Sequence, residues 1–390
     1  MDVLTQGIIT LLRSGLTGER LSLPDGFDLE QAMKPMYMHQ IQSVCYIGAV
    51  NCGLDKSQPA MQKLFQIYCG VLQHCEKQER LLAELLEAFD RDNIDYMPLK
   101  GVELRRLYPS PELRSMGDAD ILIRMEQYPR ITGIMQRLGY QQGRESDHEL
   151  LWKKDVLIVE LHKRLVPSNN RDFCAVFGDG WQMARLQEGT RYAMSREDTF
   201  VYLFTHFTKH YRDGGVGCRQ LVDLWLYLRA CELDMAYTEQ FLKKLGLLEF
   251  YGNIRRVLCA WFEDGRWDDK TQFITSVILR SGSWGDRSSH ILASVSKERQ
   301  QTGGLFRAKI RRLWKLTFLP LMYMKQKYPV LEKAPVLLPF FWIVRLVKVL
   351  FFTKGKLKKH VREYDYLSQE RTDYYEQSLH YVGLDFDVKE

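Results

Sequence analysis

The stretch YMPLKGVELRRLYPSPELRSMGDADILI, residues 96–123, decides the fold. Near its end, Asp118-Ala119-Asp120 runs directly into three apolar residues, and this pattern predicts a strand over 118–123. In a strand, residues i and i+2 point to the same face. We therefore expect the Asp118 and Asp120 carboxylates to lie side by side.

Three carboxylates are candidate metal ligands. Two adjacent carboxylates repel each other unless a cation lies between them, and Mg²⁺ binds one or two carboxylates together with substrate phosphates. A third acid, Glu160, interrupts the apolar run 156–162, which we expect to be a neighbouring strand. A carboxylate in such a run is costly unless it is paired or metal-bound. Asp118, Asp120 and Glu160 are therefore candidate catalytic residues that bind Mg²⁺ or Mn²⁺ in a phosphoryl-transfer site.

Three other polar residues have open roles. His162 follows Glu160 by two residues and is expected on the same strand face, either to orient a substrate or as a satisfied core histidine. Arg219 and Asp223 are four residues apart in a helical pattern, and this spacing predicts an ion pair.

A family resemblance rests on three motifs: Leu99-Lys100-Gly101, Gly117-Asp118-Ala119-Asp120-Ile121-Leu122-Ile123, and Val159-Glu160-Leu161-His162. They resemble the polymerase-beta-type nucleotidyltransferase superfamily, and more narrowly a bacterial family of uncharacterised nucleotidyltransferases. The likeness is strongest over about residues 75–165 and extends through helical sequence to about 290.

The resemblance implies a fold, a reaction and roles for residues. The fold is an α/β (α+β) one, a small mixed sheet with flanking helices and helical regions on both sides. The reaction moves a nucleoside monophosphate from an NTP, ATP by default, to an acceptor. Gly101 matches the turn glycine, Asp118 and Asp120 match the paired metal ligands, and Glu160 matches the third carboxylate. The acceptor stays open among a small molecule such as an antibiotic or sugar, a tRNA end and a protein side chain.

Two cations are expected to bind the triphosphate. Val102 stands where the superfamily often has Ser or Gly, so this position offers no hydroxyl to a phosphate. Lys100, beside Gly101, and Arg114 can both reach anionic oxygens near the acids. Lys100, Gly101 and Arg114 are therefore the predicted nucleotide-binding residues, with a plain surface lysine as the alternative for Lys100.

The pattern divides the chain into four parts. Residues 1–92 show helical periodicity, 93–165 hold the nucleotidyltransferase motifs, and 166–300 return to a helical pattern. Residues 301–390 form a basic amphipathic region. No internal repeat or low-complexity tract interrupts this order.

The basic region carries a strong charge asymmetry. Residues 305–362 contain fifteen Lys or Arg and one acid, Glu332, so this segment has a net charge of +14 and the rest of the chain −8. The apolar run 336–352 is too short and too charged for a membrane span and predicts an amphipathic helix. The segment is expected on an anionic membrane surface, on nucleic acid or against its own core. This leaves a second hypothesis, a catalytically degenerate binding module that acts through the basic region.

Cysteines and the N-terminus predict the compartment. Eight cysteines show no CxxC pair and no metal-ligand spacing, which is typical of buried thiols in a reducing compartment. The first residues lack the cationic start and apolar run of a signal peptide. We expect a cytoplasmic protein, peripheral at the inner face of the membrane if the basic region binds lipid.

Overall fold

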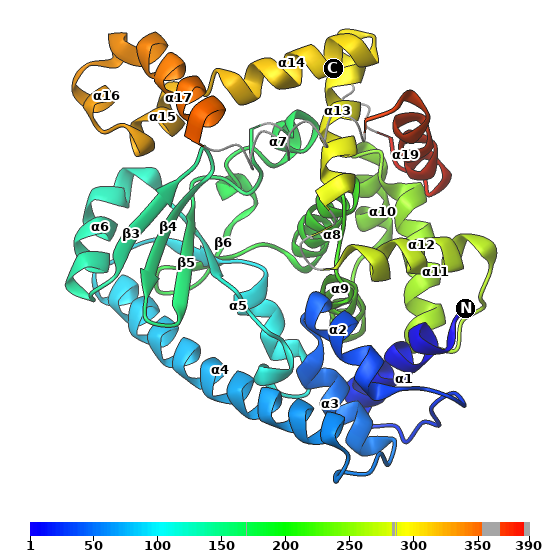
Figure 1. The fold of residues 1–390 in the computed structure, drawn as a ribbon. Coiled ribbons are helices and arrows are strands. Elements are labelled where there is room, and N and C mark those ends of the chain that lie inside the picture. The colour runs from blue at the N-terminus through cyan, green and yellow to red at the C-terminus, as the bar shows by residue number, and fades with distance from the viewer. Residues whose placement is uncertain (169, 283–284, 286, 353–366, 386–390) are drawn as a thin grey trace. The chain divides into compact units, whose positions relative to one another are not determined.

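The protein is described here from a computed structural model that covers residues 1–168, 170–282, 285, 287–352 and 367–385 (Figure 1). The last residues of the predicted basic segment, 353–362, lie outside this description. The chain forms two compact units. Of the described residues, the first unit holds those from 1 to 282 except 210–215, and the second holds 210–215 and those from 285 to 385.

The first unit is built on one mixed sheet of seven strands. In spatial order the strands are β3 (Gln141–Glu145), β4 (Glu149–Lys154), β5 (Leu157–His162), β2 (Ala119–Ile123), β1 (Tyr96–Pro98), β7 (Arg191–Ala193) and β6 (Arg185–Glu188). Strands β2 and β5 are parallel, as are β1 and β7, while the other neighbours are antiparallel. The predicted α+β fold with a small mixed sheet is confirmed.

The helices before the sheet are α1 (Val3–Thr17), α2 (Leu29–His39), α3 (Gln42–Asn51) and α4 (Pro59–Arg91). The Asp2 side chain caps α1 by accepting from the Thr5 backbone N–H, and Gly18 ends it in the left-handed conformation. Pro59 opens α4 at a position where no backbone donor is lost. The helical periodicity of residues 1–92 was therefore a correct guide to their secondary structure.

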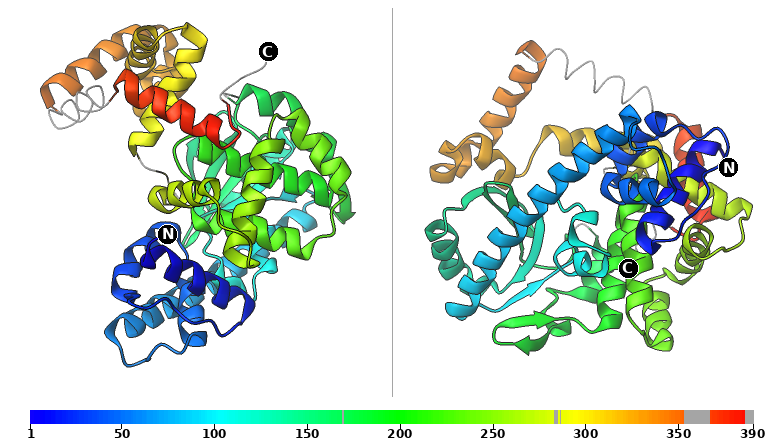
Figure 2. Two further views of the ribbon diagram at one scale, coloured as in Figure 1. Left: turned by 90° about the vertical axis from the view of Figure 1, so that its right-hand side faces the viewer. Right: turned by 90° about the horizontal axis from the view of Figure 1, so that it is seen from below.

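One face of the sheet packs against α4 and α6 (Tyr128–Arg137), as the right-hand view of Figure 2 shows for α4. Alternate strand residues such as Ala119, Ile121 and Val159 are fully buried in this core together with Leu85 and Phe89 of α4. Because strand side chains alternate between faces, the residues between them, including Asp120 and Glu160, point to the opposite face. The core therefore determines which side of the sheet carries the acids.

The remaining elements of the first unit are helical: α5 (Gly101–Leu104), α7 (Arg171–Phe177), α8 (Arg196–Arg212, whose residues 210–212 belong to the second unit), α9 (Cys218–Ala230), α10 (Met235–Lys244), α11 (Leu248–Phe262) and α12 (Asp269–Ser281), with short 3-10 turns η1 (Arg105–Leu107), η2 (Pro111–Leu113), η3 (Met125–Gln127) and η4 (Trp181–Met183). The second unit contains α13 (Arg287–Thr302), α14 (Leu305–Thr317), α15 (Leu321–Lys327), α16 (Val330–Lys333), η5 (Pro335–Leu337), α17 (Leu338–Phe352) and α19 (Gln369–Tyr381). It has two small cores, one between α13 and α14 and one around Met324, Tyr328 and Leu331.

Two sequence-based expectations about strands were wrong. The acidic strand begins at Ala119, so Asp118 precedes it. Strands β3 and β6–β7 were not predicted, and the β6–β7 hairpin lies in a region expected to be helical. Every residue of β3 and β6 is exposed, so these strands lack the alternation of buried and exposed residues that reveals a strand.

Candidate active site

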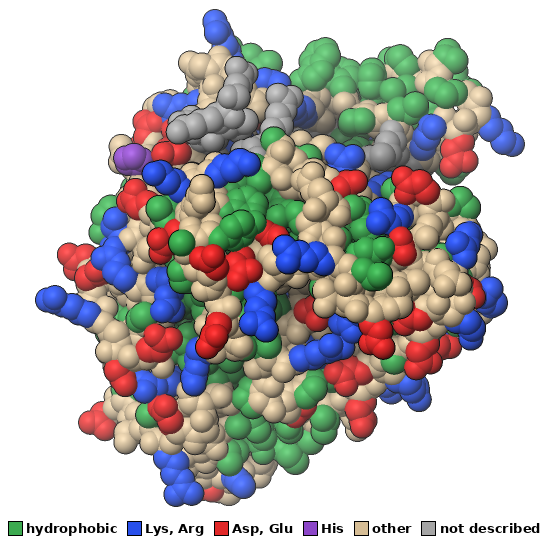
Figure 3. Space-filling view, turned by 180° about the vertical axis from the view of Figure 1, so that it is seen from behind, with side chains coloured by type: hydrophobic (Ala, Val, Ile, Leu, Met, Phe, Trp, Pro, Cys, Tyr) green, Lys and Arg blue, Asp and Glu red, His purple; other side chains and the backbone are tan. Residues whose placement is uncertain are grey.

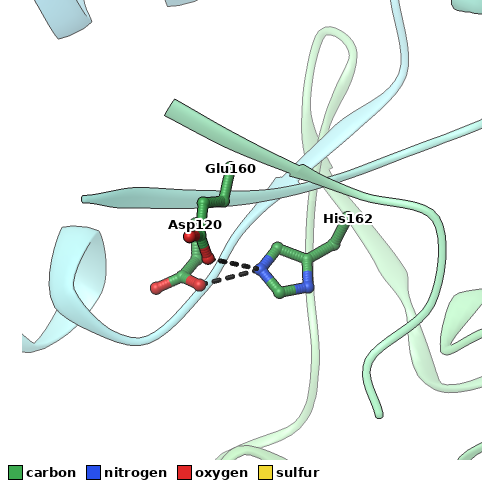
Figure 4. Close-up of side chains that lie close together, drawn as sticks. All are labelled: Asp120, Glu160 and His162. Atoms are coloured by element: carbon green, nitrogen blue, oxygen red, sulfur yellow. Dashed lines mark hydrogen bonds and ion pairs between the residues drawn. The ribbon is translucent and has the colours of Figure 1, made fainter. Parts of the chain in front are cut away.

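The site lies on the face of the sheet turned away from α4 and α6, where two parallel strands meet (Figure 4). In the register of β2 and β5, Asp120 lies opposite Glu160 and Leu122 opposite His162. This pairing brings side chains forty residues apart in the chain onto one patch. Figure 4 shows Asp120, Glu160 and His162 converging there.

The three side chains form a compact donor set. The His162 Nε2 atom lies 2.8 Å from Asp120 Oδ1 and 3.9 Å from Glu160 Oε2. Ligand atoms of all three residues lie within 4.8 Å of one another. Two carboxylates at this separation fit a hard divalent cation, which prefers oxygen ligands.

His162 is placed to orient Asp120. A carboxylate only accepts hydrogen bonds, so His162 Nε2–H donates to Asp120 Oδ1. Binding a metal through Nε2 would move the proton to Nδ1, which is buried without a partner among the described residues. A metal-ligating histidine normally donates its other N–H to an acceptor. The geometry therefore favours the carboxylates as ligands and His162 as their positioning residue.

Burial and charge separate the pKa values of the acids. Burial raises the pKa of Asp120, but the Lys100 ammonium and the His162 hydrogen bond outweigh it and hold this pKa below its usual range. Burial and the neighbouring Asp118 and Asp120 charges raise the pKa of Glu160 to about 8. Asp120 is therefore ionised at neutral pH, whereas Glu160 can take up or release a proton.

Asp118 lies at the edge of this group. It is half-buried just before β2, and its donor atoms are not among those within 4.8 Å of one another. Burial, followed by the Asp120 charge, raises the pKa of its carboxyl. Asp118 is therefore electrostatically coupled to the site, while Asp120 and Glu160 lie at its centre.

Lys100 reaches directly into the acids. Its Nζ lies 2.7 Å from Asp120 Oδ1, the same oxygen that accepts from His162. Burial alone lowers the pKa of the Lys100 ammonium, but the Asp120 charge raises it above its ordinary value. Tyr202 of α8 lies beside this ammonium, and burial raises the pKa of its hydroxyl to about 12. Lys100 therefore remains charged in the structure.

Gly101 is explained by a close approach. A Cβ atom at position 101 would lie 2.7 Å from the Arg114 Nη1 atom and 3.2 Å from the Met116 side chain. No larger residue fits there without moving the guanidinium. Gly101 therefore lets the turn after β1 pack directly against Arg114.

Arg114 is held in a buried ion pair. Its Nε and Nη2 atoms donate to the two carboxylate oxygens of Asp223, each at 2.8 Å, and the Tyr108 hydroxyl donates to the same carboxylate. Nη1, against Gly101, is the guanidinium nitrogen turned to the turn after β1. The predicted phosphate contact of Arg114 stays a prediction. The structure gives this residue a second role, because its ion pair with Asp223 holds α9 against the turn at Gly101.

The expected Arg219–Asp223 pair was wrong. Asp223 is taken by Arg114, and Arg219 instead donates through Nη1 to the Ser115 carbonyl oxygen. Its Nε atom is buried without a hydrogen-bond partner among the described residues. Burial and the nearby Arg114 charge lower the pKa of Arg219, while the charges of Asp223 and, to a smaller extent, Asp118 raise it. The sequence did not reveal Arg219 as a cation near Asp118, because the four-residue helical spacing suggested Asp223 as its partner.

A family model described as "Uncharacterised nucleotidyltransferase" matches residues 25–263. The chain belongs to this family, and the predicted resemblance is confirmed.

The other comparisons add little. The solution structure of the antibiotic-resistance factor ANT(2'')-Ia is 14% identical, with a TM-score of 0.33, and the match covers 46% of this chain and 98% of that one. A score this low does not establish a shared fold. No curated protein matches the chain.

Proposed function

We propose that the protein transfers a nucleoside monophosphate from an NTP to an acceptor in a divalent-metal-dependent reaction. The observation that carries the proposal is the register of β2 and β5, which sets Asp120 beside Glu160 with His162 and Lys100 on the same carboxylate. Carboxylates that can hold a divalent cation and a basic side chain that can bind phosphate are the groups that this chemistry uses.

In this proposal Asp118, Asp120 and Glu160 hold Mg²⁺ or Mn²⁺, which neutralises phosphate charge when bound. Lys100 and Arg219 bind triphosphate oxygens, with Arg114 contributing Nη1 beside Gly101. Asp120 or Glu160 accepts the proton of the attacking hydroxyl. His162 holds Asp120 in place.

The proposal extends to substrates and organisation. ATP is the default nucleotide, and the acceptor is a small molecule, a tRNA end or a protein side chain. We assign the catalytic core to residues 93–165, flanked by helical parts at 1–92 and 166–300, with 301–390 as a separate basic part. All eight cysteines are free thiols, which supports a reducing compartment such as the bacterial cytoplasm.

The acceptor can be found directly. Purified protein is incubated with each α-labelled NTP, Mg²⁺ and a cell extract separated into small-molecule, tRNA and protein fractions. We expect label in one fraction with one preferred NTP, and none with the Asp120→Asn variant. Equal labelling by that variant would exclude the proposed site as its source.

A second candidate function is supported by the surface of α14 and α17. Apolar side chains recur along both segments at three- and four-residue steps and are 43–82% exposed. They are Phe306, Ile310, Leu313 and Trp314 in α14, and Val336 in η5 followed by Phe340, Ile343 and Val347 in α17. Figure 3 shows hydrophobic side chains gathered over this part of the chain with Lys and Arg beside them. No helix among the described residues is long and apolar enough to cross a membrane.

Such stripes suit an anionic membrane surface, where apolar side chains enter the acyl boundary and cations meet headgroups. A nucleic-acid groove has little use for Val336 or Ile343. Part of the charge is already paired, since Arg311 and Lys315 contact Glu298. We propose peripheral membrane contact through α14 and α17, in addition to catalysis.

Vesicle co-sedimentation tests this contact. The full-length protein is expected to pellet with anionic vesicles but not neutral ones, because each exposed cation contributes about 1 kcal/mol of attraction to anionic headgroups. Salt screens this attraction and is therefore expected to weaken the binding. Phe306→Ser/Trp314→Ser is expected to reduce binding at least about 10-fold. Leu186→Ser, which changes an exposed leucine of β6, is the matched control. Protein that stays in solution with anionic vesicles at low salt would contradict membrane contact.

A further inference from the structure

The Lys100 ammonium is bound to Asp120, the central acid of the site. It is 2.7 Å from Asp120 Oδ1, and His162 Nε2 donates to that same oxygen from 2.8 Å. The Asp120 side chain is only 7% exposed, so water contributes little to its neutralisation. In this state Asp120 is therefore already compensated by the protein itself.

The backbone indicates that this placement is retained against a conformational cost. Lys100 has φ +43° and ψ −113°, a region that glycine enters easily and side-chain-bearing residues avoid. Such conformations persist where the surroundings impose them, and they cluster at functional sites. A glycine at position 100 would relieve the backbone but would remove the ammonium from Asp120.

A bare divalent cation and this ammonium compete for Asp120. Like charges a few ångströms apart repel strongly at a site this buried, so the Lys100 charge opposes the binding of a bare divalent cation between Asp120 and Glu160. A nucleotide changes the balance, because its phosphates give the displaced ammonium a new anionic partner. Metal and nucleotide then favour each other's binding through one side chain.

We infer that Lys100 is a built-in counter-ion of Asp120 that excludes a free divalent metal from this carboxylate. When the metal–nucleotide complex binds, the Lys100 ammonium leaves Asp120 and contacts the phosphates instead. This inference rests on the proposed function. It adds that the site binds the metal–nucleotide complex in preference to the free divalent cation.

The inference is tested by titrating nucleotide-free protein with Mn²⁺ and counting free ion by electron paramagnetic resonance. Lys100→Met is expected to bind Mn²⁺ at least about 10-fold more tightly than the wild type, within the usual range of coupling between two sites. Lys100→Arg keeps the charge and is expected to bind as weakly as the wild type. A non-hydrolysable NTP analogue is expected to tighten Mn²⁺ binding strongly in the wild type and much less in Lys100→Met.

Two controls locate the effect. Lys154→Met removes a cation from the same sheet, where Lys154 pairs with Glu84 at 2.7 Å, and is expected to leave Mn²⁺ binding unchanged. Lys100→Met/Asp120→Asn is expected to lose the gain. As a second readout, Mn²⁺ should raise the melting temperature of Lys100→Met more than that of the wild type.

Failure of this inference and failure of the proposed function are distinguishable. Mn²⁺ affinity in Lys100→Met that equals or falls below the wild-type value overturns the counter-ion role, even if the wild type turns over NTP. Tighter Mn²⁺ binding in a protein that turns over no NTP supports the counter-ion role and removes the proposed function.

Discussion

Replacing Asp120 by Asn is expected to lower nucleotidyl transfer at least about 10³-fold, a loss of about 4 kcal/mol of transition-state stabilisation. The carboxamide carries no charge for a hard cation and leaves Lys100 without its partner. For the same reason, Mg²⁺ or Mn²⁺ with NTP should raise the melting temperature of the wild type but not that of the variant. Asp118→Asn is expected to weaken the same response, because Asp118 lies at the edge of the donor set.

Stability must be separated from binding in this experiment. Breaking a buried ion pair from one side costs about 3–5 kcal/mol, so Asp120→Asn is expected to melt earlier than the wild type without ligand. Lys100→Met/Asp120→Asn removes both charges and serves as the folded control. An equal shift of melting temperature by metal and NTP in the wild type and in all these variants would contradict the metal assignment.

Glu160→Gln is expected to lower turnover at least about 10²-fold, the lower scale of a general-base contribution. In the metal-free protein the pKa of Glu160 is about 8, so a metal must displace a proton from it near neutral pH. Wild-type activity at subsaturating Mg²⁺ should therefore rise as pH increases toward about 8, and the variant should lack this rise. The same shift affects stability. Metal-free protein should lose stability between pH 4.5, the ordinary pKa, and about 8, because the folded state holds a proton that the unfolded state releases.

A measurement of turnover and of unfolding against pH checks both effects. Near-normal turnover in Glu160→Gln would move the third acid elsewhere. Glu149 of β4 is the next candidate, since its charge contributes to the raised pKa of Glu160. Its own carboxylate contacts His148 Nε2 at 2.9 Å, which lowers its pKa and makes it a poorer proton acceptor.

Much of the fold could be predicted because its signals are local. The apolar run after Asp120, the stripe of α4 and the turn at Gly101 each arise from neighbouring residues, and they led to the correct fold class. The edge strands β3 and β6 could not be predicted, since their exposed residues give no alternation. The acidic strand β2 begins at Ala119, one residue later than the sequence pattern predicted, and Asp118 therefore lies at the edge of the site and not at its centre.

The partners within the site depend on distant pairings. Asp223 meets Arg114 across 109 positions of the chain, and this contact displaced the pair with Arg219 that helical spacing suggested. Likewise, the contact between Lys100 and Asp120 follows from the antiparallel pairing of β1 and β2, which sets Pro98 opposite Ile121. Residue types therefore predicted the kind of chemistry, whereas the tertiary fold decided which cation compensates which acid.

The central claim is that Asp120 and Glu160 support nucleotidyl transfer that depends on a divalent metal. The most direct measurement compares α-labelled with γ-labelled NTP in the presence of the identified acceptor fraction, with Mg²⁺ and with chelator. The account predicts that label from the α-phosphate enters the acceptor, that label from the γ-phosphate leaves as pyrophosphate, and that chelator or Asp120→Asn stops both. Transfer of the γ-label to the acceptor, or α-label transfer that persists in chelator and in Asp120→Asn, would contradict it.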